Sequence, residues 1–425
     1  MHAPLDPGVT TLSDEPDRAL SRNRDFLVVL AGQGISSVGD AVTFTALPLL
    51  VLALTGSGLV MGIVGVLQTI PHLIVGMFAG ALADRNDRRR MMLLADLGRA
   101  VLTACIPLSI VVGLPTVWVI VVVTPPMAVL STIFLAAYTA ATPALVGRSL
   151  IAQATAIFEA VYSTGYIVGP ILAGLLAATV GPATTIGIDA LSFLASATAL
   201  SMVQRPLVPP TDRASTHILT DIREGIAFVA RHRTLRPLLF FWTAYSIVSA
   251  PLVPVLTFFV TRDRGWEAGS LGLILAAFGI GTVFGSLLTA RLARGRAGWL
   301  MLGGNLVRGA VLLGVAYAPT LEWTLPFALV GGIADSLVLV TYISVRASSA
   351  PDELIGRVGS TMRTISVGLQ PIGMLAGGAV LDVIHGRDTL VAMAILFVLV
   401  TILALPSGAL RDVRFRRASP GAMSG

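Results

Sequence analysis

The sequence has no lysine, a single cysteine and few charged residues of any kind. Only 12% of its 425 residues are charged, about half the share that soluble domains carry, whereas 55% are hydrophobic. A soluble surface needs many more polar side chains, so a single soluble globular core is excluded. The lone cysteine, Cys105, excludes an intrachain disulfide framework.

Features of enzymes and of nucleic-acid-binding proteins are also missing. The glycine-rich stretch GIGTVFG (279–285) lies in an apolar run with no strand before it, so helix packing explains it better than a phosphate loop. The five histidines are dispersed, which predicts no metal site, and we expect no cofactor. The sequence shows no nucleophile–base pair of the kind that would indicate an enzyme. The net charge of +6 is explained by membrane topology, and we expect no nucleic-acid partner.

Long apolar runs dominate what is present. Because a spanning helix needs about 20 mostly apolar residues, the runs predict an all-α integral membrane protein with twelve transmembrane helices in two six-helix bundles. The predicted spans are 25–54, 58–83, 91–112, 116–145, 154–179, 183–203, 236–260, 267–293, 299–318, 322–346, 358–384 and 389–409.

The spans divide the chain into two halves joined by a longer, charged linker. In the linker, residues 221–232 place Ile222, Ile226 and Val229 on one helical face, which predicts an amphipathic helix at the membrane surface. Gly80 and Pro170 of the first half match Gly285 and Pro371 of the second at a nearly constant offset, as in the internal duplications of secondary transporters. The predicted parts are an N-terminal tail (1–24), a first bundle (25–204), the linker (205–235), a second bundle (236–410) and a C-terminal tail (411–425).

All 29 basic residues are arginines, and they are unevenly distributed. Arg262, Arg264 and Arg387 lie in loops on one side of the predicted membrane, while most of the others lie in the tails and in loops on the opposite side. By the positive-inside rule, the sequence predicts a multi-pass plasma-membrane protein with both termini and the linker in the cytoplasm.

The loop between the second and third spans reads GALADRNDRRR (80–90). It resembles the signature loop of the major facilitator superfamily, Gly-x-Leu-Ala-Asp-Arg-x-Gly-Arg-Arg, although Asp87 stands where that family usually has glycine. The resemblance implies a gating loop that contacts the opposite bundle in one state of the transport cycle. Its residues here would be Gly80, Asp84, Arg85, Arg88 and Arg89.

Further stretches resemble one branch of that superfamily, which includes macrolide and siderophore exporters. They are residues 32–62, 142–156 and 223–239. In the fifth span, GYIVGPILAG resembles an exporter motif, and the alternative is small-residue helix packing. The motif residues are Gly165, Gly169, Pro170 and Gly174, with Ala173 in place of one glycine.

The resemblance implies that spans one, four, seven and ten line a central cavity. Polar and aromatic residues on these spans are the candidate lining: Gln33, Ser37, Phe44, Ser131, Tyr138, Trp242, Tyr245, Ser246, Ser249 and Tyr342. A pocket that is apolar and aromatic with two acids suits an amphipathic, often cationic, organic substrate.

Acids inside the membrane are the sharpest signal, since each costs about 2.5–3.5 kcal/mol or more at the bilayer centre. Asp40 and Asp335 are central in spans one and ten, and Asp40 has no basic residue within ten positions. We expect them to bind protons and substrate, the alternative being acids that only fix helix packing. Asp96 and Arg99 are three residues apart on one helix and are expected to pair. Asp189 lies nearer the outer side and is a weaker candidate.

Together these observations predict a proton-coupled exporter of an amphipathic small organic molecule, driven by the proton gradient. Its partners would be its substrate, protons and membrane lipids, and we expect a monomer. An importer with the same fold and a membrane sensor that transports nothing remain as alternatives.

Overall fold

The computed structural model describes residues 20–147, 149–207, 218–292, 295–351 and 354–413, apart from the side chains of Met77 and of residues 218–223. A first bundle contains six long helices after a short 3-10 helix, η1. The bounds are Leu20–Arg22 for η1, Arg24–Thr55 for α1, Gly58–Ala83 for α2, Arg88–Val112 for α3, Thr116–Val146 for α4, Ile151–Val180 for α5 and Pro182–Ser201 for α6.

A second bundle follows the linker helix α7 (Ile218–Arg231). Its first span is broken into α8, α9 and a π-helical turn, η2. The bounds are Leu235–Ser249 for α8, Leu252–Phe258 for α9, Phe259–Asp263 for η2, Ala268–Leu292 for α10, Ala297–Tyr317 for α11, Leu321–Ser349 for α12, Ile355–Ala404 for α13 and Gly408–Arg411 for α14.

Eleven helical segments of the described chain are long and apolar enough to cross a membrane, and the last of them, α13, is long enough to cross twice. α13 has 50 residues, whereas about 20 suffice for one crossing. Its helical path is interrupted at His385, whose φ of 66° and ψ of 175° lie outside the helical region. Backbone and side-chain atoms of Phe259 lie against Gly386, where a Cβ would clash. The predicted fold of twelve spanning helices in two bundles is confirmed.

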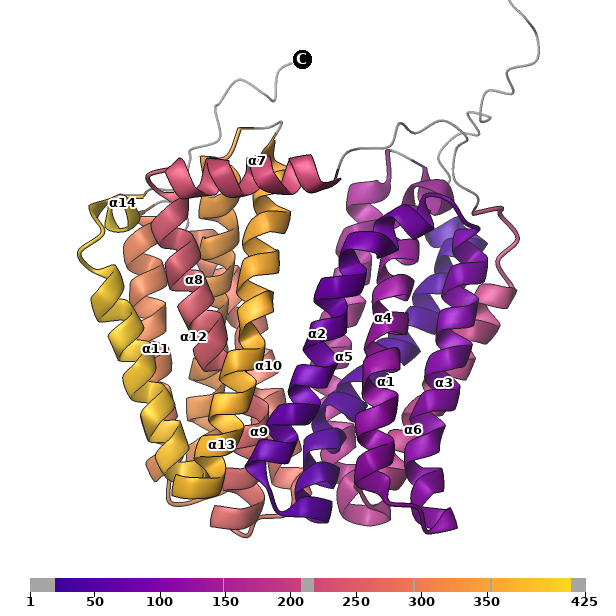
Figure 1. The fold of residues 1–425 in the computed structure, drawn as a ribbon, viewed down its shortest axis with the longest axis horizontal. Helices are drawn as coiled ribbons and strands as arrows, with labels where there is room; N and C mark the ends of the chain where they lie inside the picture. The colour runs from indigo at the N-terminus through magenta and orange to yellow at the C-terminus, as the bar shows by residue number, and fades with distance from the viewer. Residues whose placement is uncertain (1–19, 148, 208–217, 293–294, 352–353, 414–425) are drawn as a thin grey trace, which may run out of the picture.

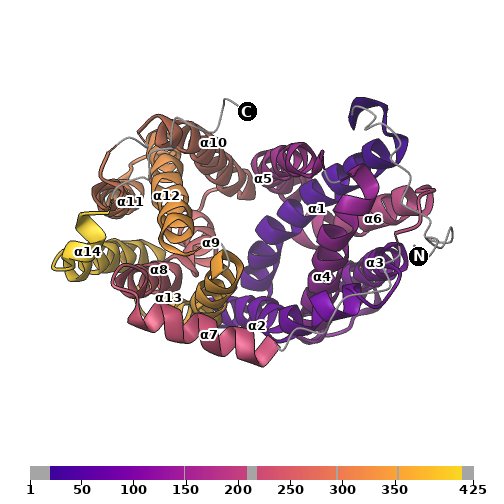
Figure 2. The same cartoon turned by 90° about the horizontal axis from the view of Figure 1, so that it is seen from above.

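The two bundles stand side by side, with α7 across one end of the second (Figure 1). Seen from that end, α5 lies beside α10 and α2 lies beside α13 (Figure 2), and these two pairs make the main contacts between the bundles. The ribbons of the two bundles diverge towards the α7 end and converge at the far end (Figure 1).

Glycines allow the bundles to touch at the far end. A Cβ on Gly58 would lie 2.5 Å from the Cβ of Leu381, and one on Gly62 would lie 2.5 Å from the carbonyl oxygen of Met374. Likewise, a Cβ on Gly174 would lie 2.9 Å from the Cα of Gly269. Real Cβ atoms do not approach this closely, so helix backbones are in direct contact at these positions.

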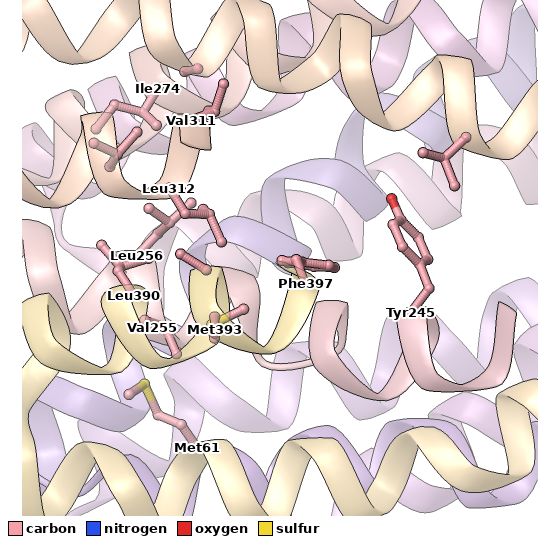
Figure 3. Close-up of a cluster of buried hydrophobic side chains, with 14 of the residues drawn as sticks. Met61, Tyr245, Val255, Leu256, Ile274, Val311, Leu312, Leu390, Met393 and Phe397 are labelled. Atoms are coloured by element: carbon pink, nitrogen blue, oxygen red, sulfur yellow. The ribbon is translucent and has the colours of Figure 1, made fainter. Parts of the chain in front are cut away.

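Buried hydrophobic side chains join the two bundles into one core. Figure 3 shows Phe397 and Tyr245 in the second bundle, and Met61 of α2 pointing towards Val255 of α9. All four are at most 4% exposed. The cluster therefore passes from the second bundle into the first at the end where the helices converge.

The linker helix α7 packs on the start of α13. Val229 is 2% exposed, Gly225 lies against Thr361, and Glu224 forms an ion pair of 2.6 Å with Arg357. Ile226 is 47% exposed. The predicted apolar face is therefore only partly right, because the packed face is centred on Gly225 and Val229.

The side chain of Ile222, the third residue of that predicted face, lies outside the described residues.

Candidate transport cavity

A cavity of about 600 Å³ lies between the bundles, lined by residues from α1, α5 and from α8 to α12. Aliphatic and aromatic side chains make up most of its wall on the side of the second bundle, among them Ile274, Phe278, Val311 and Leu312. The volume is typical of sites for small organic molecules.

Three aromatic residues line the cavity on the side of the first bundle. Tyr162 and Tyr166 of α5 have ring centroids 4.8 Å apart, and the Tyr162 hydroxyl donates to the Tyr166 hydroxyl at 3.1 Å. The ring of Phe44, from α1, lies 6.3 Å from that of Tyr166. The sequence analysis missed both tyrosines. Their spacing of four residues, continued by Pro170, marks one face of a helix, and all three line the cavity.

A second-bundle ion cluster lies at the cavity wall and consists of Arg308 of α11, Asp335 of α12 and Tyr245 of α8. Arg308 Nη1 and the Tyr245 hydroxyl both donate to Asp335 Oδ1. The guanidinium carbon of Arg308 lies 5.2 Å from the ring centroids of Tyr245 and Phe397. The Asp335 side chain remains 22% exposed. One cation thus faces one anion, and the carboxylate is open to the cavity.

A first-bundle ion cluster surrounds Arg99 of α3. Its Nη2 donates to Asp96 Oδ1, as the three-residue spacing predicts, and its Nη1 lies 3.9 Å from Asp40 Oδ1. Its guanidinium carbon lies 4.3 Å from the ring centroid of Phe193. Asp40, which has no basic residue within ten positions in the sequence, therefore does have a cationic neighbour in the structure. The basic residue comes from another helix, so the local sequence around Asp40 does not reveal it.

The other predicted lining residues are divided between the cavity and helix packing. Phe44, Ser249 and Asp335 line the cavity. The remaining nine, Asp40 included, are not among its described lining residues; besides Asp40 they are Gln33, Ser37, Ser131, Tyr138, Trp242, Tyr245, Ser246 and Tyr342.

Most of these residues bind neighbours within their own bundle. Gln33 donates to Ser196 Oγ at 3.0 Å, and Ser37 donates to the carbonyl oxygen of Gly34 at 2.9 Å. The rings of Trp242 and Tyr342 stack with centroids 4.0 Å apart.

Three further predicted residues lie within the bundles. The ring of Tyr138 packs edge-on to that of Phe158 at 5.0 Å. Ser246 is 5% exposed, and Ser131 is half-buried on α4.

The predicted exporter motif of α5 lies where helices pack closely. A Cβ on Gly165 would lie 2.7 Å from Ser37 Oγ of α1. Gly169 packs against Ala41, which is also on α1. Gly174 faces α10, and the carbonyl of Pro170 lies against Gly272 of α10. The motif residues thus pack α5 against both bundles, which is the small-residue packing that the sequence left as the alternative.

The predicted gating loop is anchored within the first bundle. Asp84 and Arg88 form an ion pair of 3.8 Å. Arg89 Nε donates to the carbonyl oxygen of Leu200 at 2.9 Å, at the end of α6. A Cβ on Gly80 would meet no atom of a neighbouring described element within 4 Å, and Arg85 is exposed. At this end, therefore, Gly80 makes no close contact with another helix among the described residues.

A carboxylate closes the opposite end of the interface. Asp382 of α13 accepts hydrogen bonds from the Ser57 hydroxyl at 2.7 Å and from the backbone N–H groups of Gly58 and Leu59. These groups form the N-terminus of α2, so a side chain of the second bundle binds a helix end of the first. The bundles are thus held together at the end far from α7.

Comparison with known proteins identifies the family. Residues 19–418 match the family of transmembrane secretion effectors. The chain belongs to this branch of the major facilitator superfamily. It is thus an efflux-type membrane transporter and not an enzyme, which confirms the resemblance seen in the sequence.

Two relatives of this family member cover most of its length. The multidrug efflux pump Tap of Mycolicibacterium fortuitum is 30% identical over 400 residues, which are 91% of this chain and 97% of that protein. The enterobactin exporter EntS of Escherichia coli O1:K1 is 28% identical over 361 residues, 83% of this chain and 84% of EntS.

Solved structures share the fold at low sequence identity. A bacterial homolog of the lysosomal transporter Spinster, in an inward-facing and unoccupied conformation, has a TM-score of 0.75 at 14% identity, covering 94% of this chain and 99% of that one. The nucleoside transporter NupG has a TM-score of 0.77 at 12% identity, covering 90% and 98%.

Proposed function

We propose that the protein exports an amphipathic small organic molecule in exchange for protons. The observation that carries this proposal is the cavity of about 600 Å³ between the bundles, with apolar and aromatic walls and the carboxylate of Asp335. Such a surface suits a molecule with a flat apolar part and a cationic group. The relatives Tap, a multidrug efflux pump, and EntS, an enterobactin exporter, support a drug, antibiotic, siderophore or secondary metabolite as the substrate.

Alternating access would expose this cavity to each side of the plasma membrane in turn. The arginine distribution supports a cytoplasmic position for the α7 end and for both termini. The Asp382 contact closes the far end, so the described conformation would receive substrate from the cytoplasm. We expect the transporter to work as a monomer surrounded by lipid.

The two predicted acids would divide the work of coupling. The Asp335 side chain is at the cavity wall and would attract the cationic group of the substrate. The Asp40 side chain is 42% exposed and close to Arg99, so it would exchange protons with water. Asp84 and Arg88 would leave their present positions and contact the second bundle when the α7 end closes.

Proteoliposomes with an imposed pH gradient test this function, with ethidium as a fluorescent organic cation. We expect the wild-type protein to accumulate ethidium against its gradient. The Asp40→Asn variant should lose this accumulation yet retain downhill exchange, while Asp412→Asn, which changes an exposed acid beyond α14, should behave as wild type. If Asp40→Asn and Asp335→Asn both keep the full response to the gradient, the coupling assignment fails.

The same vesicles separate the alternatives. An importer would accumulate its substrate in the direction of proton entry. A sensor would bind ethidium without moving it across the membrane.

A further inference from the structure

A further acid inside the membrane, Asp189, lies buried in the first bundle and is not among the described residues that line the cavity. Asp189 lies near the middle of α6, and the residue is only 1% exposed. α6 packs on α1, α3 and α5. The position needs explanation, because an ionised carboxylate in such a place is costly unless a cation or several donors stabilise it.

Two hydroxyl groups hold the carboxyl group of Asp189. Its Oδ2 lies 2.6 Å from Thr43 Oγ1 of α1, and its Oδ1 lies 2.7 Å from Ser192 Oγ of α6. A Cβ on Gly39 would overlap with Asp189 Oδ1. The carboxyl group therefore packs directly on the backbone of α1, next to the residue that precedes Asp40.

The surrounding charges do not balance Asp189. From α3, Arg99 contacts Asp96 and lies 3.9 Å from Asp40 of α1, so this one cation already faces two acids. Arg99 and Asp40 both interact electrostatically with Asp189. The acid of α5, Glu159, interacts with tyrosines instead. With all three aspartates ionised, the first-bundle ion cluster and Asp189 together would carry three negative charges against one positive charge.

Hydroxyl partners suit a protonated acid as well as an ionised one. A carboxylic acid donates one hydrogen bond and still accepts others, and a hydroxyl group can serve as either partner. The acid of Asp189 can thus donate to Thr43 Oγ1 while Ser192 donates to it. Asp96 is paired with Arg99, and the Asp40 side chain, 3.9 Å from Arg99, is 42% exposed. Among these three acids, Asp189 is the one that forms no ion pair with a described residue, and its two hydroxyl partners can accommodate a neutral acid.

We infer that Asp189 is a proton-binding site and holds a proton in the described conformation. This inference deepens the proposed function, because it rests on proton exchange by the first bundle. Proton binding forms one O–H bond on Asp189, and its release returns the proton to water by way of the Asp40 side. The charge of the first bundle then changes during the cycle, while the second-bundle ion cluster remains a balanced pair.

Infrared spectroscopy of the purified protein in detergent tests the site directly. At neutral pH the wild-type protein should show the C=O stretching band of a protonated carboxylic acid, and Asp189→Asn should lose that band. Asp335→Asn, with its acid in the second bundle, should keep it. An unchanged band in a folded Asp189→Asn protein overturns the inference.

A second pair of variants keeps the test decisive if Asp189→Asn does not fold. Thr43→Val and Ser192→Ala each remove one hydrogen-bond partner and leave the acid in place. Either change should shift the frequency of the acid band, because the carbonyl stretch responds to hydrogen bonding. A band that neither substitution shifts belongs to another residue, and the inference is then wrong.

The spectra also separate this inference from the proposed function. A band lost in Asp189→Asn together with transport that ignores the pH gradient would leave the proton site standing and reject the coupling. Gradient-driven transport together with an acid band that survives Asp189→Asn would support the coupling and reject the proton site at Asp189.

Discussion

Each bundle buries an arginine near the middle of its third spanning helix, and these two arginines differ in the charge around them. Arg99 of α3 and Arg308 of α11 both lie over a phenylalanine of the sixth span, at 4.3 Å from Phe193 and 5.2 Å from Phe397. Arg308 binds one acid, whereas Arg99 faces two and interacts with a third. The shared scaffold supports the internal duplication, and the unequal charges distinguish the two bundles.

One pair of equivalent residues accounts for part of this difference. Asp96 stands three residues before Arg99, and Asn305 stands three residues before Arg308. The Asn305 amide donates to the carbonyl oxygen of Phe397 and to Thr401 Oγ1, both at 2.8 Å, and it carries no charge. An acid in one bundle is thus replaced by a neutral amide in the other, at a site where both side chains are completely buried.

Removing the buried cations should produce the largest difference in stability between the two bundles. We expect Arg99→Leu to lower stability by about 3–5 kcal/mol, because it leaves buried acids without a cation. Arg308→Leu should cost less, since Asp335 is open to the cavity and can be hydrated or protonated there. Thermal unfolding of both variants in detergent measures the difference. Equal losses would show that the two clusters are energetically alike.

Exchanging the equivalent acid and amide should alter proton binding. Asn305→Asp places a second acid beside Arg308, so the variant should bind about one more proton than wild type at neutral pH, since that site lacks a second cation. Asp96→Asn replaces the charged partner of Arg99 with a neutral amide. The interaction between the two side chains should weaken by about 1.5–3 kcal/mol, the usual value for a hydrogen bond to a charged group.

Potentiometric titration of the folded proteins counts the protons, with Asp412→Asn as a control outside the bundles. A titration curve for Asn305→Asp identical to that of wild type would show that Arg308 stabilises two carboxylates at once.

The two partly exposed acids, Asp335 and Asp40, should separate substrate binding from coupling. Asp335→Asn should raise KM for ethidium about tenfold, equivalent to about 1.4 kcal/mol, while accumulation still responds to the pH gradient. Asp40→Asn should give the reverse pattern. Initial rates in proteoliposomes at several ethidium concentrations distinguish the two, and a common effect of both variants on KM would place both acids at the substrate site.

The smallest effect is expected at Tyr245, the hydroxyl donor to Asp335 in the second-bundle ion cluster. Tyr245→Phe removes one donor to Asp335 and keeps the ring beside Phe397. Stability should fall by about 0.5–1.5 kcal/mol. Thermal unfolding measures this change. A loss as large as that of Arg308→Leu would mean that the hydroxyl group, and not the guanidinium, holds Asp335.

Contacts within one helix were predictable, and contacts between helices were not. Asp96 and Arg99 lie three residues apart, so helical geometry alone places them together. The partner of Asp40 lies on another helix, and so does the partner of Asp335, so the rotation of each helix within its bundle decides these pairs. The rotation of α5 likewise decides that Tyr162 and Tyr166 face the cavity.

Apolar run length determined the twelve spans, because a bilayer of given thickness requires helices of a given length. The arginine-rich loop and the repeated glycines and prolines indicated the family and its two halves. Only the tertiary structure decided which acids are balanced by a cation. Charge balance depends on distances of a few ångströms between side chains of different helices, and those distances are determined when the helices pack.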